Sequence, residues 1–128
     1  MRLAVIIALA ALTCCQLFAV DEVAQLYGLS YAENSHRKIG KRGELGDWQM
    51  MPYNVKKYGG YQMVHALMML RDVIEDLKNR GVDPSPFNIA LAWNAGPKAA
   101  SMGKAPVASY HYAAKAERRY NEIVHGPR

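Results

Sequence analysis

Hydrophobic residues recur at helical spacing through most of the chain that follows residue 20. The clearest repeat has steps of four and three residues: Met63, Leu67, Leu70, Ile74 and Leu77. These steps keep one apolar stripe along one face of a helix. The pattern predicts a long amphipathic helix ahead of Gly81, where glycine commonly ends a helix. Within it we expect Met63, Met68 and Met69 to be adaptable core filler.

Glycine and proline residues predict two shorter helices before this one. The first is expected over residues 21–35, with Val23 and Leu26 facing inward. The second is expected to begin at Pro52 and to end at Gly59. Proline suits the first turn of a helix, and glycine suits the position just past its end.

Two more helices are predicted in the second half of the chain. Ser85 is placed to cap the first of them and Pro86 to occupy its first position, and the helix carries Ile89, Leu91 and Trp93. The last helix is expected over residues 106–124. Its inner face should comprise Val107, Tyr112 or Ala113, Ala116, Tyr120 and Ile123.

Residues 36–47 (HRKIGKRGELGD) lack an apolar period and contain three glycines. We expect an irregular loop there, with at most a small hairpin. No stretch alternates apolar and polar residues for long enough to predict a strand. The fold class is therefore expected to be all-α, a small helical domain with an irregular glycine-rich loop.

The N-terminal segment has the pattern of a secretory signal peptide. Arg2 is followed by the unbroken apolar run LAVIIALAAL over residues 3–12. We expect residues 1–19 to be removed after Ala19 and the protein to be periplasmic or extracellular, with no transmembrane span in the mature chain. Lipid attachment at Cys14 or Cys15 is the alternative, but the preceding residues suit it poorly.

Residues 20–128 are expected to form one domain with a single core. They contain no cysteine, which excludes a disulfide framework, a thiolate metal site and a cysteine nucleophile. The chain has a net charge of +5, and loss of Arg2 with the signal peptide leaves +4. A basic exported domain favours an anionic partner: a cell-wall polymer, a membrane surface or nucleic acid.

Three short motifs occur in a fixed order along the chain. Glu33 is followed by Asn34 and Ser35, residues 43–52 read GELGDWQMMP, and residues 90–97 read ALAWNAGP. This order resembles the transglycosylase SLT domain of lytic transglycosylases, relatives of goose-type lysozyme. That family has a glutamate usually followed by serine, then G-L-M-Q-I-M-P, then A-Y-N-A-G before a final helix with tyrosines. The resemblance covers about residues 21–123.

The resemblance implies a lysozyme-like fold and cleavage of the MurNAc-GlcNAc bond in peptidoglycan glycan strands. Glu33 would be the single catalytic acid and base, and the family's products carry a 1,6-anhydro ring. A carboxylic acid can protonate the leaving oxygen near neutral pH only if its surroundings raise its pKa. Glu44 and Asp47 are the candidates for a second carboxylate, which glycosidases with two carboxylates would need.

The same resemblance implies a set of substrate-binding residues. Gly46 would allow close approach of the glycan, and Gln49 would bind the glycan or position the acid. Trp48 and Trp93 would stack on sugar rings or pack in the core. The remaining members of the set are Met51 on the groove wall, Asn94 as a donor to acetamido groups, and Tyr112 beside the glutamate.

The chain departs from the family pattern at several motif positions. Asn34 replaces the serine, Asp47 and Trp48 replace the leucine and methionine of G-L-M-Q, and Trp93 replaces the tyrosine of A-Y-N. A hydrolysing lysozyme and a non-catalytic cell-wall-binding domain of the same fold therefore remain alternatives. Action on membranes or nucleic acid through a basic cluster ranks third, and we expect no nucleic-acid partner. The cluster comprises Arg37, Lys38, Lys41 and Arg42.

Other chemistries find little support in the sequence. The four histidines are scattered without the spacing of a zinc helix, and no phosphate-binding glycine loop follows a strand. The serines lack the context of a nucleophile elbow. We therefore expect neither a metal nor a cofactor.

Overall fold

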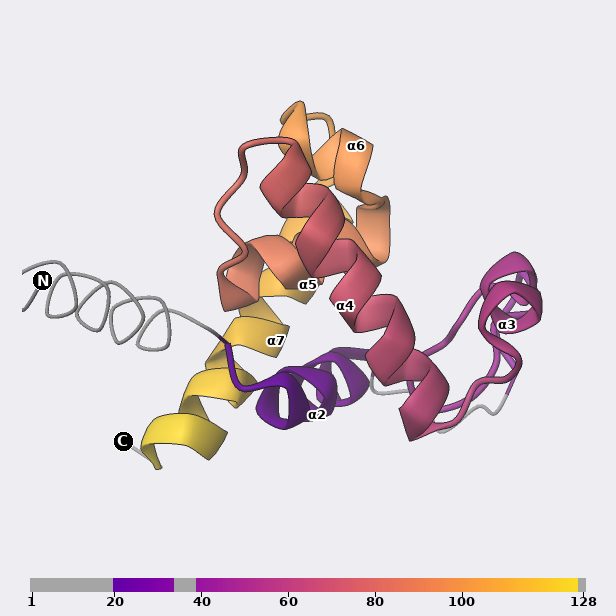
Figure 1. The fold of residues 1–128 in the computed structure, drawn as a ribbon. Coiled ribbons are helices and arrows are strands. Elements are labelled where there is room, and N and C mark those ends of the chain that lie inside the picture. The colour runs from indigo at the N-terminus through magenta and orange to yellow at the C-terminus, as the bar shows by residue number, and fades with distance from the viewer. Residues whose placement is uncertain (1–19, 34–38, 127–128) are drawn as a thin grey trace, which may run out of the picture.

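A computed structural model describes residues 20–33 and 39–126. Within these residues the chain forms helices and isolated β-bridges, and no sheet (Figure 1). The helices are α2 (Glu22–Glu33), α3 (Pro52–Tyr58), α4 (Met63–Asn79), α5 (Pro86–Ala95), α6 (Pro97–Ser101) and α7 (Val107–His125). The all-α prediction is confirmed. The short helix α6 was not predicted.

Helix α5 is the centre of the fold, with α4 and α7 packed against it (Figure 1). Five consecutive residues of α5, from Ile89 to Trp93, are buried, so the helix is covered on all sides. Its start follows the prediction, because the Ser85 hydroxyl accepts a hydrogen bond of 3.1 Å from the Asn88 amide. A central helix with these contacts holds its C-terminal end, at Asn94 and Ala95, in a fixed place.

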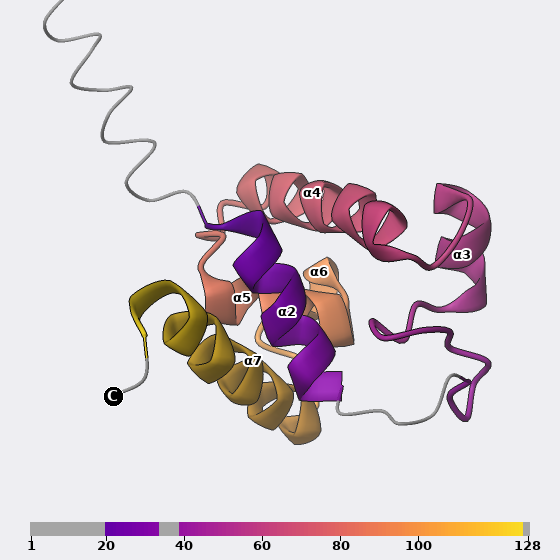
Figure 2. The same cartoon turned by 90° about the horizontal axis from the view of Figure 1, so that it is seen from below.

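Helices α2 and α7 lie side by side along much of their length (Figure 2). At Gly28, an added Cβ would lie only 2.7 Å from the Ala116 carbonyl oxygen, so the two backbones approach as closely as glycine allows. Leu26 and Leu29 of α2 are buried, but Val23 is half exposed. The predicted inward orientation of Val23 is wrong because α2 turns its other face, with Ala24 and Leu29, toward the core.

The stripe on α4 packs as predicted only in part. Leu70 and Leu77 are buried, and Ala66 and Val73 complete the inner face. Met63 and Met68 are exposed, so their assignment as core filler is wrong. Met69 is half-buried and packs against the core.

The last helix also differs from its predicted inner face at the two ends. Ala113, Ala116 and Tyr120 are buried as predicted, whereas Val107 and Ile123 are exposed. Both lie in the terminal turns of α7. The Tyr120 hydroxyl accepts a hydrogen bond of 3.0 Å from the Asp21 amide, which ties the start of α2 to the end of α7.

Residues 39–58 form a lobe, called here the turn lobe, to one side of the helical body (Figures 1 and 2). Leu45 forms antiparallel bridges with Ile39 and with Met50, and these bridges take the place of the small hairpin that the sequence allows. Helix α3 begins at Pro52, and Gly59 follows it at a positive φ of 88°, as predicted. The turn lobe thus depends on backbone hydrogen bonds and glycine turns, and on two buried side chains, Trp48 and Met50.

Some predictions fall outside the described residues. They are the signal peptide over residues 1–19, lipid attachment at Cys14 or Cys15, and the segment 34–38 with Asn34, Arg37 and Lys38. In the part that the structure describes, none of the helices has the length and apolar character needed to cross a membrane.

Candidate active site

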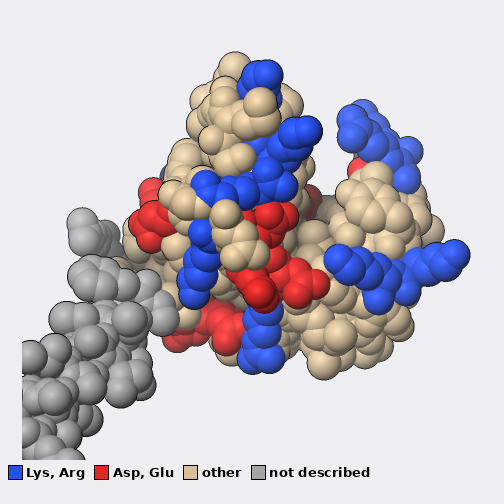
Figure 3. Space-filling model, turned by 45° about the horizontal axis from the view of Figure 1, so that its top comes forward, with Lys and Arg blue, Asp and Glu red and all other residues tan. Residues whose placement is uncertain are grey.

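A cavity of about 970 Å³ separates the turn lobe from the helical body. Its lining comes from the end of α2, the turn lobe, the middle of α4, the end of α5 and the start of α7. Figure 3 shows the hollow between the two parts, with acidic side chains gathered in the middle of this face and basic side chains over the lobe at the right. A volume of this size suits a ligand as large as a short oligosaccharide.

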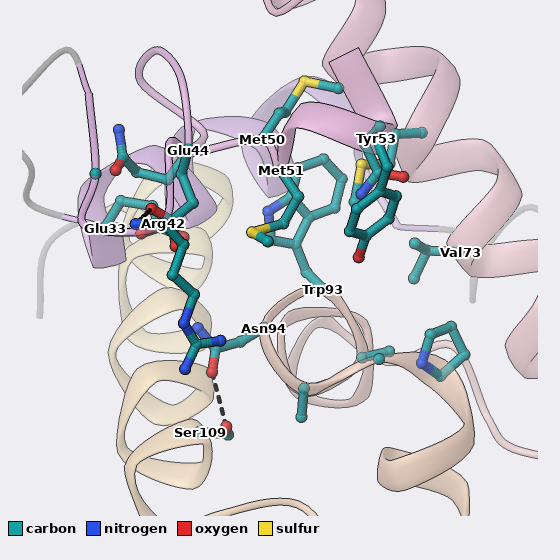
Figure 4. A pocket seen from close by; sticks show the side chains of 18 of the residues that line it. Glu33, Arg42, Glu44, Met50, Met51, Tyr53, Val73, Trp93, Asn94 and Ser109 are labelled. Carbon is teal, nitrogen blue, oxygen red and sulfur yellow. Dashed lines mark hydrogen bonds between the residues drawn. The ribbon is translucent and has the colours of Figure 1, made fainter. Parts of the chain in front are cut away.

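Glu33 is the last residue of α2 and its side chain lines this cavity (Figure 4). Burial raises the pKa of the Glu33 carboxyl from 4.5 to about 7, and the nearby Glu44 carboxylate adds to the rise. A hydrogen bond with the Tyr112 side chain acts in the opposite direction. Burial is the larger effect, so Glu33 holds its proton close to neutral pH.

Tyr112 stands on α7 beside Glu33, with its hydroxyl buried between α2 and α7. Burial and the adjacent Glu33 carboxylate raise the pKa of Tyr112 well above its ordinary value, so its hydroxyl keeps its hydrogen. The Leu29 carbonyl oxygen lies 3.5 Å from the same hydroxyl, at the long limit of hydrogen bonding. The hydroxyl has one hydrogen, and a carboxylate is the stronger acceptor. Tyr112 is therefore placed to donate to Glu33 once that group has lost its proton.

The two candidates for a second carboxylate occupy different positions. Glu44 lines the cavity, but one of its oxygens accepts a hydrogen bond of 2.9 Å from the Arg42 amide. Asp47 is exposed and does not line the cavity. Glu44 therefore has a structural role in the turn in addition to its place near Glu33.

Gln49 lines the cavity from the turn lobe, as the resemblance implies. Its backbone adopts a positive φ of 47°, which is uncommon for a residue with a side chain. Its side-chain amide donates a hydrogen bond of 2.7 Å to the Gly46 carbonyl, which fixes the turn over residues 46–49. Any Cβ at Gly40 would overlap the Gln49 and Glu44 side chains, so these groups pack directly over Gly40.

Trp48 and Gly46 do not line the cavity, although the resemblance places both near the glycan. Trp48 is only 7% exposed and its indole N–H donates a hydrogen bond of 2.8 Å to the Leu26 carbonyl. Of its two possible roles, core packing is the one the structure shows. Gly46 has a positive φ of 77° and contacts Tyr61, so a turn and close packing account for the glycine.

Trp93 and Asn94 bring the end of α5 to the cavity (Figure 4). Trp93 is 9% exposed, so it belongs to the core and presents little of its surface to the cavity. The Asn94 side-chain oxygen accepts a hydrogen bond of 2.7 Å from the buried Ser109 hydroxyl. This bond occupies the acceptor of the amide, which leaves its N–H groups available to a ligand.

The remaining lining residues include several that the sequence did not single out. Met51 lies on the cavity wall as expected. Ser109, Tyr53, Tyr58 and Asp72 also line the cavity, and the Tyr58 hydroxyl donates a hydrogen bond of 2.7 Å to Asp72. Their spacing in the sequence does not predict a shared site, because they come from α3, α4 and α7, which surround the cavity only in the folded chain.

Among the described residues, no histidine lines the cavity. The side chain of His65 accepts a hydrogen bond of 3.2 Å from the Gln62 amide and so caps α4. Among the described residues, no group of histidine, aspartate or glutamate side chains has an arrangement that could hold a metal ion.

Comparisons with known proteins found nothing similar: no family model, no curated protein and no solved structure matches the chain.

Proposed function

We propose that the protein is a peptidoglycan lytic transglycosylase with a lysozyme-like fold and Glu33 as its catalytic acid and base. The supporting observation is a carboxyl group in a cavity of oligosaccharide size whose pKa is raised to about 7. A group with this pKa is half protonated near neutral pH, which suits both proton donation and proton removal. The proposal includes export to the cell wall, which residues 1–19 predict.

In the proposed reaction Glu33 gives its proton to the glycosidic oxygen while the bond from that oxygen to C1 of the muramoyl residue breaks. The N-acetyl group of that sugar stabilises the oxocarbenium-like state. The 6-hydroxyl then bonds to C1 and returns its proton to Glu33. No water is consumed, and the product ends in a 1,6-anhydro ring.

Tyr112 supports the middle of this cycle, when Glu33 carries a negative charge. Burial disfavours that charge, whereas a hydrogen bond from the Tyr112 hydroxyl favours it. The two opposing effects keep the acidic and basic forms of Glu33 close in free energy. One carboxyl can then serve as acid in the first step and as base in the second.

Substrate binding is assigned to the cavity walls on both sides of Glu33. The Asn94 amide N–H groups, held by Ser109, would donate to acetamido carbonyl oxygens. Met51 and the exposed ring of Tyr53 would contact the faces of the sugar rings. Gln49 would shape the wall that the turn lobe contributes.

Hydrolysis is the second candidate, because Glu44 lines the same cavity and would be the base that activates water. Its carboxylate already accepts the Arg42 amide hydrogen bond, which favours the structural role. A binding domain without activity is disfavoured by Glu33 itself. Burying the Glu33 carboxyl costs free energy, since no described cation pairs with it, so a purely structural role would not favour a glutamate at this position.

The test is digestion of purified peptidoglycan with the protein and with Glu33→Gln, followed by mass spectrometry of the soluble fragments. We expect anhydro-muropeptides from the unmodified protein and a loss of activity of about 100- to 10,000-fold in the variant. Glutamine keeps the shape of the side chain and removes the proton. Fragments with reducing ends would instead show that the protein is a hydrolase and not a transglycosylase.

Glu75→Gln is the matched control, because Glu75 is exposed on α4 and does not line the cavity. It should release fragments at the unmodified rate. If no fragment appears with any of the three proteins while all of them sediment with the cell wall, the catalytic proposal fails and the binding domain replaces it.

A further inference from the structure

Two basic side chains of the turn lobe, Lys41 and Arg42, line the same cavity as Glu33. Neither of them forms an ion pair within residues 20–33 and 39–126. By contrast, Arg71, Arg80 and Arg119 each pair with an acidic side chain. The cavity therefore contains cationic groups whose charge no described residue neutralises at contact distance.

The turn that carries Arg42 is held by a dense set of hydrogen bonds. The Gly40 amide donates to the Glu44 carbonyl at 2.7 Å, and the Gly43 amide donates to the Gly40 carbonyl at 3.1 Å. The Arg42 amide donates to the Glu44 carboxylate at 2.9 Å. Gly43 has a positive φ of 83°, which closes the turn. The backbone of Arg42 is thus fixed before any ligand binds.

The side chain of Arg42 extends from this turn across the cavity toward Asn94 (Figure 4). It thus reaches from the turn lobe toward the wall that carries Glu33 and Asn94. A guanidinium group offers several N–H donors in a planar fork that matches a carboxylate. Lys41 adds a second positive charge on the same rim of the cavity.

We propose that Lys41 and Arg42 form a carboxylate-binding subsite that selects glycan strands bearing acidic substituents over neutral ones. This inference rests on the proposed function, because it names the part of the cell-wall polymer that the cavity recognises. Every second sugar of peptidoglycan carries a lactyl ether. Its carboxylate is either free or extended by a peptide that ends in carboxylates. Chitin has the same sugar backbone without these groups.

The experiment measures binding by calorimetry with Glu33→Gln as the background, so that no ligand is cleaved. Three tetrasaccharide ligands are used: a muropeptide with its peptides, the same saccharide with free lactyl carboxylates, and chitotetraose. Adding Arg42→Gln should weaken binding of one or both acidic ligands about tenfold, which equals about 1.4 kcal/mol. Binding of chitotetraose should not change.

The ligand that loses affinity identifies the source of the carboxylate. Loss with the free lactyl saccharide assigns the lactyl group, and loss with the muropeptide alone assigns the peptide. Lys56→Gln is the matched control, because Lys56 is exposed on α3 and does not line the cavity. It removes the same charge and should leave all three affinities unchanged.

Two results would overturn the subsite: equal weakening for chitotetraose, or no weakening for either acidic ligand. Circular dichroism melting of each variant checks that the fold is kept. Failure of this inference is separate from failure of the proposed function. Selection by charge can be present without cleavage, and anhydro products can appear while Arg42→Gln binds all ligands normally.

Discussion

The two sides of the cavity are built by different means. The helical body holds its side with buried side chains of α2, α5 and α7, and α5 is covered all round. The turn lobe holds its side largely with backbone hydrogen bonds and glycine turns: only Trp48 and Met50 of its residues are buried, and α3 has no buried residue. The body therefore resists change through packing, and the lobe resists it through local backbone geometry.

This difference matches the distribution of chemistry. Glu33 and Tyr112 belong to the helical body, where burial shifts their pKa values. The cations Lys41 and Arg42, which form no ion pair with a described residue, belong to the turn lobe, where their side chains are exposed to solvent. A dry environment makes a weak acid weaker, whereas a charged recognition group has to remain solvated until its ligand arrives. The fold provides both conditions on opposite walls.

The largest expected effect comes from breaking the contact that joins the two sides. Trp48 belongs to the turn lobe by sequence, but its ring lies in the core and its N–H binds the Leu26 carbonyl. Trp48→Ala should lower the free energy of unfolding by about 3–5 kcal/mol. Urea denaturation followed by circular dichroism measures this change.

Tyr53→Ala is the comparison, because Tyr53 is an aromatic residue of the same lobe that is 67% exposed. Its free energy of unfolding should change by no more than about 0.5 kcal/mol. Similar losses in both variants would show that the lobe contributes to stability along its whole length and would contradict the difference between the two sides of the cavity.

A smaller effect is expected at the hydrogen bond between Ser109 and Asn94. Ser109→Ala removes the donor that holds the Asn94 amide oxygen. We expect the KM for peptidoglycan to rise about fivefold with little change in kcat, and the free energy of unfolding to fall by about 1 kcal/mol. Initial rates of fragment release over a range of substrate concentrations separate KM from kcat.

Ser101→Ala serves as its control, since the Ser101 hydroxyl donates only to the Lys98 carbonyl within α6. That variant should keep both kinetic constants. A decrease in kcat with unchanged KM in Ser109→Ala would assign Asn94 to the reacting centre and contradict its positioning by Ser109.

The helices were predictable because their signals are local. Each signal lies within a few residues of the helix that it defines. The apolar repeat through Leu70 and Leu77 lies within α4. The residues that start or end a helix, Ser85 and Pro86 for α5 and Gly59 for α3, directly adjoin it. Helix α6 escaped prediction because five residues are too few to show a period. The orientation of Val23 failed because α2 has a weak hydrophobic pattern, and its neighbours decide which face is buried.

The candidate site was predictable only where the motif order named its residues. The structure brings Glu33, Gln49, Met51, Trp93 and Asn94 to one cavity and places Tyr112 behind Glu33. Trp48 looked equally suited to a sugar or to the core, since both use the same apolar ring. Ser109 and the cavity-facing side of Arg42 depend on contacts between distant segments, which no local pattern reports.

The central claim is that the Glu33 carboxyl keeps its proton up to about pH 7. The most direct test is to titrate its carboxyl carbon by NMR in protein labelled at glutamate, with Glu33→Gln identifying the resonance. We predict a midpoint of about 7, with the proton held below that pH and lost above it. A midpoint near the ordinary value of 4.5 would contradict the account, because Glu33 would then be ionised at neutral pH and could not donate the proton.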